Sequence, residues 1–131
     1  MIQLPVAIGL TVCEQVIVEE KTRNITLVNC LARLRVREIP SEPHRLVFYA
    51  RLTDGIGDGK ICLEILRPDN LDEFLSQEIS AKFADPLQEF RAVFRGSLSF
   101  PVEGRYQVNL LANGVSIVRR TLHVSVKEEK S

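Results

Sequence analysis

The chain has 131 residues, of which 45% are hydrophobic and 26% charged. This composition is ordinary for one globular domain, which we place at residues 1–127, with a charged tail at 128–131. The 17 basic and 17 acidic residues cancel. Balance of this kind excludes a general nucleic-acid binder, which relies on excess positive charge to displace counterions. No stretch approaches the roughly 18 consecutive apolar residues of a membrane span.

Short alternating segments between Gly, Pro, Asn and Asp predict an all-β chain. The first strand covers about residues 5–18, with a break near 13–15, and the second about 25–38. On the second strand, one face carries Val28, Cys30, Ala32, Leu34 and Val36. The other face carries Asn29, Leu31, Arg33, Arg35 and Arg37.

The row of Arg33, Arg35 and Arg37 has two interpretations. It pairs with acidic residues of a neighbouring strand, such as Glu64 or Glu14, or it forms a contact surface for an acidic partner. RNA or DNA is disfavoured, because no aromatic platform accompanies the arginines.

A third strand is predicted at 45–53 and a return strand at 60–66, joined by Asp54-Gly55-Ile56-Gly57-Asp58-Gly59. We expect this segment to be a hairpin loop in which the glycines supply positive φ and the aspartates cap the turn. The alternative is a Ca²⁺ site that uses Asp54 and Asp58. The spacing matches neither an EF-hand nor a phosphate-binding loop.

Two weaker strands are predicted at 75–83 and 88–94, and the best helical candidate is a short turn at 70–77. The C-terminal pair of strands alternates most clearly. A three-residue loop at 112–114 pairs Val108 with Val118 and keeps every apolar residue on one face. A two-residue Asn113-Gly114 turn needs a bulge, placed at 119–120, to do the same.

Gly104-Arg105-Tyr106 is typical of the corner before the penultimate strand of immunoglobulin-like domains, where the Tyr hydroxyl bonds back across the turn. Val108 stands where antibody domains have a Cys, and the chain has no Trp. The fold class predicted is therefore an immunoglobulin-like antiparallel β-sandwich of seven to eight strands, without the antibody disulfide.

Much of the chain resembles a family of small uncharacterised bacterial proteins, a domain of unknown function. The resemblance is carried by 13–19 (CEQVIVE), 26–30 (TLVNC), 33–38 (RLRVRE), 52–59 (LTDGIGDG), 85–89 (DPLQE) and 101–106 (PVEGRY). It implies no activity.

Cys13, Cys30 and Cys62 are far apart and odd in number, which favours three buried thiols in a reduced cytoplasm; a Cys13–Cys30 bridge is the alternative. His44 and His123 have no metal-ligand spacing. We therefore expect no catalytic residue and no cofactor.

The function predicted is a non-catalytic protein-interaction or oligomerisation module that binds a protein or itself, and neither nucleic acid nor membrane. The predicted contact residues are Arg33, Arg35, Arg37 and Leu31. The outward apolar residues Leu27, Val93 and Leu111 and a free C-terminal strand edge suggest further contact surfaces. An enzyme with an unrecognised site is a further alternative.

Overall fold

The computed structural model describes residues 2–127, over which the chain forms ten β-strands. They are β1 (Val6–Cys13), β2 (Gln15–Val18), β3 (Ile25–Val28), β4 (Arg33–Val36), β5 (His44–Thr53), β6 (Gly57–Leu66), β7 (Glu73–Phe83), β8 (Phe90–Leu98), β9 (Gly104–Ala112) and β10 (Val115–Val126). The predicted tail at 128–131 lies outside this range. Between residues 2 and 127 no helix has the length and hydropathy needed to cross a membrane.

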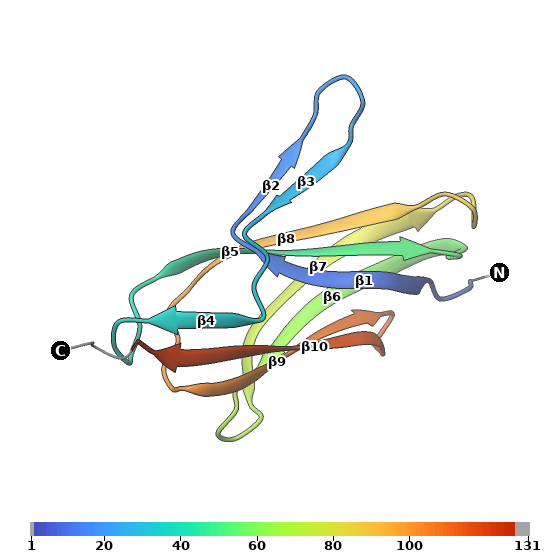
Figure 1. Ribbon diagram of the computed structural model, residues 1–131. Helices are drawn as coiled ribbons and strands as arrows, with labels where there is room; N and C mark the ends of the chain where they lie inside the picture. Colours follow the sequence, from blue (N-terminus) through green and yellow to red (C-terminus); the bar gives the residue numbers. More distant parts are fainter. Residues whose placement is uncertain (1, 128–131) are drawn as a thin grey trace.

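Two sheets pack face to face as a sandwich (Figure 1). The smaller sheet has the order β1-β5-β8, and the larger has the order β4-β10-β9-β6-β7. Within the sheets every pair is antiparallel except β4 with β10, which run parallel. The strands β2 and β3 form a separate hairpin that projects away from the sandwich (Figure 1). The predicted β-sandwich is confirmed.

The strand number is ten because both N-terminal segments break. The first breaks at Glu14, as predicted, into β1 and β2. The second, predicted as one strand, breaks between β3 and β4, where Asn29 adopts a left-handed φ of 54°. The inward face predicted for this segment is correct only at Leu34 and Val36, which are buried, whereas Cys30 and Ala32 are exposed.

The predicted hairpin at 54–59 is wrong, because β5 and β6 belong to different sheets. The segment instead carries the chain from one sheet to the other. Two of its positions favour glycine for different reasons. Gly57 has a left-handed φ of 88°, and a Cβ on Gly55 would lie 2.7 Å from the ring of Phe83. The helical candidate at 70–77 is also wrong, because β7 begins at Glu73 and Asn70 only supports a turn.

The C-terminal hairpin has a two-residue turn. Ala112 pairs with Val115, and Asn113 and Gly114 have φ values of 49° and 83°, as a type I′ turn requires. A bulge between Ser116 and Val118 then corrects the register, so that Leu122 pairs with Tyr106. The three-residue loop is therefore wrong, and the bulge lies closer to the turn than the predicted position at 119–120.

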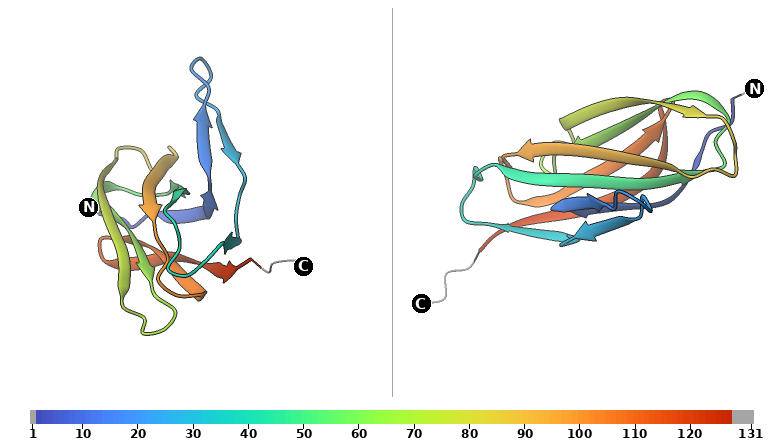
Figure 2. Two further views of the ribbon diagram at one scale, coloured as in Figure 1. Left: turned by 90° about the vertical axis from the view of Figure 1, so that its left-hand side faces the viewer. Right: turned by 90° about the horizontal axis from the view of Figure 1, so that it is seen from above.

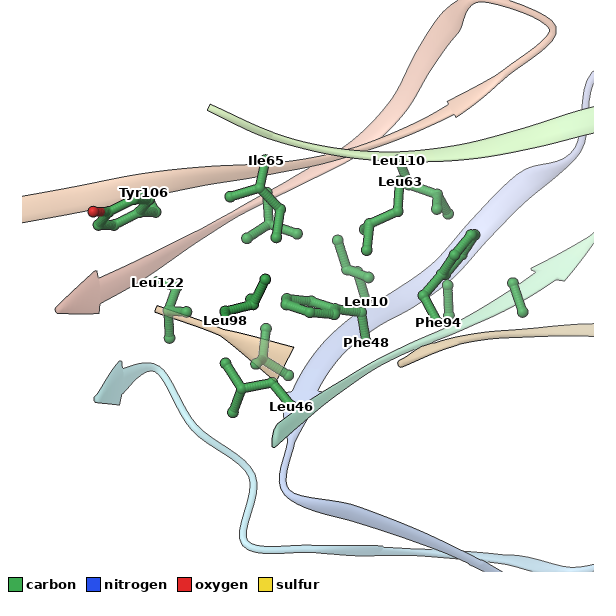
Figure 3. Close-up of a cluster of buried hydrophobic side chains, with 14 of the residues drawn as sticks. Leu10, Leu46, Phe48, Leu63, Ile65, Phe94, Leu98, Tyr106, Leu110 and Leu122 are labelled. Atoms are coloured by element: carbon green, nitrogen blue, oxygen red, sulfur yellow. The ribbon is translucent and has the colours of Figure 1, made fainter. Parts of the chain in front are cut away.

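The core lies between the two sheets (Figure 3), and its largest buried side chains include Phe48, Phe94, Phe100 and Tyr106. The Tyr106 hydroxyl donates a hydrogen bond to the carbonyl of Val102 at 2.7 Å and accepts one from its amide at 3.3 Å. These bonds confirm the predicted corner. Gly104 has a φ of 138°, and a Cβ there would lie 2.8 Å from Pro68, so the corner requires glycine.

Candidate functional site

A cleft of about 600 Å³ opens on the outer face of the larger sheet, where β4 lies beside the end of β10. We call it the basic cleft. It is lined by Arg33, Arg35, Glu103, His123, Ser125, Val126 and Lys127. Alternation along β4 buries Leu34 and Val36 and leaves the two arginines exposed. The same alternation along β10 buries Leu122 and Val124 and turns His123 and Ser125 outward.

Strand register sets three basic side chains in one row across the sheet. His123 pairs with Arg33 on its β4 side and with Arg105 on its β9 side. Ser125 pairs with Arg35 in the next outward-facing row. Arg33 and Arg105 therefore lie on either side of His123, and this row contains two guanidinium groups and no carboxylate.

The cleft has one acidic side chain among residues 2–127, and that side chain is already engaged. Glu103 Oε1 accepts a hydrogen bond of 2.7 Å from the backbone amide of Val126. Arg33, Arg35 and Lys127 take part in no salt bridge within the described range. Three permanent cations therefore face one carboxylate.

The predicted pairing of the arginine row with Glu64 or Glu14 is wrong. Glu64 lies on β6 and pairs with Ser76 and Asn109, and both β9 and β10 separate this strand from β4. Glu14 lines a hollow over the smaller sheet, beside Arg45 and Arg95. The neighbour of β4 is β10, which contributes histidine and serine in place of a carboxylate.

Two of the predicted contact residues lie away from the cleft. Arg37 follows the end of β4 and lies near Glu42, whose carboxyl pKa is lowered by its own backbone amide, by His44 and by Arg37. The backbone amide of Leu31 donates a hydrogen bond to the carbonyl of Val12 at 2.7 Å, and its side chain packs against the core. The side chain of Leu31 is therefore half-buried against the core and lies outside the lining of the basic cleft.

Asp54 and Asp58, the ligands of the alternative Ca²⁺ site, are both exposed and lie on different elements. Asp54 precedes β6 with a left-handed φ of 63°, whereas Asp58 is within β6 and opposite Lys82. In the range 2–127 no group of three or more His, Cys, Asp or Glu side chains is placed to hold a metal ion.

The three cysteines are free, so the Cys13–Cys30 bridge does not form. Cys13 is buried and Cys62 half-buried, but Cys30 is exposed, contrary to the prediction of three buried thiols. Burial raises the pKa of the Cys13 thiol, with a smaller contribution from Cys30. A raised thiol pKa lowers the thiolate fraction and so makes Cys13 a poor nucleophile.

A second groove, of about 510 Å³, lies between the projecting hairpin and the outer face of the smaller sheet. It is lined by Asn24, Ile25, Leu27, Tyr49, Arg51, Glu89 and Arg91. The Glu89 carboxylate accepts from Arg51 Nε at 2.9 Å and from Arg91 Nε at 3.2 Å. Arg91 also donates to the carbonyl of Arg23 at the hairpin tip, at 2.7 Å. This groove is charge-balanced more closely than the basic cleft, because its carboxylate is shared by two guanidinium groups.

Sequence reasoning found Arg33 and Arg35 but missed their partners in the cleft. His123 and Lys127 come to lie beside the arginines only through the parallel pairing of β4 with β10, and Arg105 joins the same row through its pairing with His123, outside the lining of the cleft. The one available signal was the alternation of the last strand, which places His123 opposite Leu122 and Val124.

A family of unknown function (DUF6941) matches the chain over residues 9–125. Among solved structures, an immunoglobulin-like protein from Pseudomonas aeruginosa matches with a TM-score of 0.51 at 14% identity, covering 93% of this chain and 97% of that one. A CARDB domain from Pyrococcus furiosus, in complex with di-metal ions, matches with a TM-score of 0.46 at 14% identity, covering 95% and 96%. The first confirms the immunoglobulin-like fold, and no curated protein matches.

Proposed function

This chain belongs to DUF6941, a family of unknown function, and we propose that it is a binding domain that holds an acidic segment of a partner protein in the basic cleft. The observation that carries the proposal is the row Arg105–His123–Arg33, beside Arg35 and Lys127, with Glu103 bound to the backbone. The cleft lies on regular strands, which fix its side chains better than a loop would.

Guanidinium groups favour carboxylates as partners. Each presents a planar set of donors that matches the two oxygens of an Asp or Glu side chain. Arg33 and Arg35 project from the same face of β4, two residues apart, so they match alternate carboxylates of an extended acidic segment. A strand-like partner with acidic residues at every second position therefore fits this cleft best.

A protein partner suits the cleft better than a nucleic acid. The lining residues include no aromatic side chain on which a base would stack. The whole chain also has a formal net charge of zero, so its long-range attraction to a polyanion is weak. We propose binding without catalysis. The lining holds a histidine and a hydroxyl, His123 and Ser125, but no hydrogen bond joins the two side chains, and no cluster in the described range is placed to hold a metal ion.

The test is a titration of the full chain against a fluorescein-labelled poly-Glu peptide, followed by fluorescence anisotropy at low ionic strength. We expect saturable binding that weakens as salt rises, because the contacts are exposed ion pairs. Reversal of both charges in an Arg33→Glu, Arg35→Glu variant should weaken binding at least about tenfold.

The matched control is Arg45→Glu, Arg95→Glu, which changes the same charge on the outer face of the other sheet. This variant should bind within about twofold of the wild type. Equal losses in the two variants would mean that net charge, rather than the cleft, determines binding. Tighter binding of single-stranded DNA than of the acidic peptide would also contradict the proposal.

A further inference from the structure

The predicted free edge of the C-terminal strand is covered by β4 over the last four residues of β10, His123–Val126, because β10 lies between β4 and β9 in the sheet. The long free edge of the larger sheet belongs to β7. This strand has 11 residues, and within the described range β6 is its one neighbour in the sheet. Its position at the border of the sandwich is visible in the left view of Figure 2.

The β7 edge lacks most of the features that keep edges from pairing. Its sequence, EFLSQEISAKF, contains no proline or glycine, and its register with β6 is regular from Leu75 to Phe83. Natural edges are usually blocked by proline, by bulges or by charges. The one irregularity of β7 is at its start, where Phe74 is an extra residue in the pairing with β6. From Leu75 onwards only charges are present, and they have both signs: Glu78 and Lys82 project from the solvent-facing side.

These two charges are symmetric about Ser80. We propose that two copies of the chain associate through β7 in antiparallel register, with Ser80 opposite Ser80 of the second copy. Glu78 of each copy then lies opposite Lys82 of the other, and on the inner face Ile79 lies opposite Ala81. Both charged pairs are attractive, and on the inner face apolar residues lie opposite apolar residues.

The charges also select this register over slipped ones. A slip of four residues in one direction sets Glu78 opposite Glu78, and in the other direction Lys82 opposite Lys82, and both arrangements repel. Gln77 donates to the carbonyl of Arg95 at 3.0 Å and so ties the inner side of β7 to β8. This bond uses the side chain and leaves the β7 backbone available for pairing.

This interface is separate from the basic cleft, because β7 and β4 are opposite edges of the same sheet. A failure of acidic-peptide binding therefore says nothing about the pairing of β7, and the reverse also holds.

The first test exchanges the charges of the full chain and measures association by sedimentation equilibrium. Glu78→Lys alone and Lys82→Glu alone each set like charges opposite one another twice, so each should raise the dimer dissociation constant about tenfold or more. An equimolar mixture of the two variants should restore association, because both lysines of the first variant then face glutamates of the second. Glu73→Lys, on the same strand but outside the paired segment, is the control and should associate as the wild type does.

The second test fixes the register by disulfide formation in a Cys30→Ser, Cys62→Ser background. Ser80→Cys should give a dimer on a non-reducing gel after mild oxidation, because the two copies of residue 80 are directly opposed and their Cα atoms lie within disulfide range. Ser76→Cys should not cross-link, because its counterpart is residue 84 of the second copy. A wild type that stays monomeric at every concentration, a mixture that associates no better than its components, or equal cross-linking at both positions would each overturn the proposal.

Discussion

The Tyr106 corner gives the most direct test of how the fold is stabilised. Tyr106→Phe removes one oxygen from a fully buried side chain and leaves the ring in place, packed against Phe100 and Phe74. The hydroxyl that is lost makes two hydrogen bonds to the backbone of Val102, at 2.7 and 3.3 Å. The variant therefore leaves a carbonyl and an amide of a partly buried turn without their partner.

A backbone polar group left unpaired in the interior costs about 1–3 kcal/mol. Since Val102 is half-buried, water satisfies part of this loss, and we expect the free energy of unfolding to fall by about 2 kcal/mol. For a domain of this size, that corresponds to a decrease in Tm of roughly 8 °C. Urea unfolding should show a lower midpoint with an unchanged slope.

Tyr49→Phe is the control. Tyr49 is also buried, but its hydroxyl makes no hydrogen bond to residues 2–127, so this variant should lose less than about 0.5 kcal/mol. Similar losses in both variants, or no loss in Tyr106→Phe, would refute the role assigned to the corner. Burial also raises the pKa of the Tyr106 hydroxyl. The contribution of this hydroxyl to the free energy of unfolding is therefore complete below its unfolded pKa of about 10. It is lost as the pH rises through the higher pKa of the folded state.

Three further predictions concern other sites. Arg51, and to a smaller extent Arg91, lower the pKa of Glu89. The contribution of Glu89 to stability is therefore complete above its unfolded pKa of about 4.3 and is lost as the pH falls through the lower pKa of the folded state. Glu89→Gln should accordingly reduce the loss of Tm on acidification. Gly104→Ala should cost about 3 kcal/mol in chemical unfolding, because the φ of 138° strains alanine and the new Cβ would meet Pro68. The control Gly9→Ala, whose Cβ meets nothing within 4 Å, should be nearly neutral. About 1 mM Ca²⁺ should leave Tm unchanged; a rise that Asp54→Ala and Asp58→Ala abolish would instead support the Ca²⁺ alternative.

The sequence predicts which residues face inward much better than it predicts which strands pair. Alternation correctly assigns one buried face of β6, β9 and β10, because burial on one face leaves a period of two in the sequence itself. In β5 it misses Val47 and Tyr49, which are buried on the other face. Alternation carries no information on which strands pair with one another. The segment 54–59 is therefore expected to close a hairpin although it connects two sheets, and the break at Asn29 is missed because asparagine is compatible with both a strand end and a turn.

The candidate site is predictable to the same extent. Arg33 and Arg35 stand out because they alternate with apolar residues within one short segment. The rest of the basic cleft depends on β10 lying parallel to β4, a long-range pairing with no local signature. Turn chemistry is predictable only in part: the Asn113-Gly114 turn has the expected type I′ residues, but the bulge that sets its register depends on packing of β10 against the core.

The arrangement of the larger sheet, with the cleft at the β4 edge and the free edge at β7, has a consequence for affinity. If two copies pair through β7, their two-fold axis is perpendicular to the sheet, and both clefts lie on the same face at its two ends. A partner with two acidic segments could then attach its second segment at the effective concentration set by its first. Two individually weak sites would in this way give a complex about 10² to 10⁴ times tighter than either alone, provided that the linker between the segments spans the joined sheet.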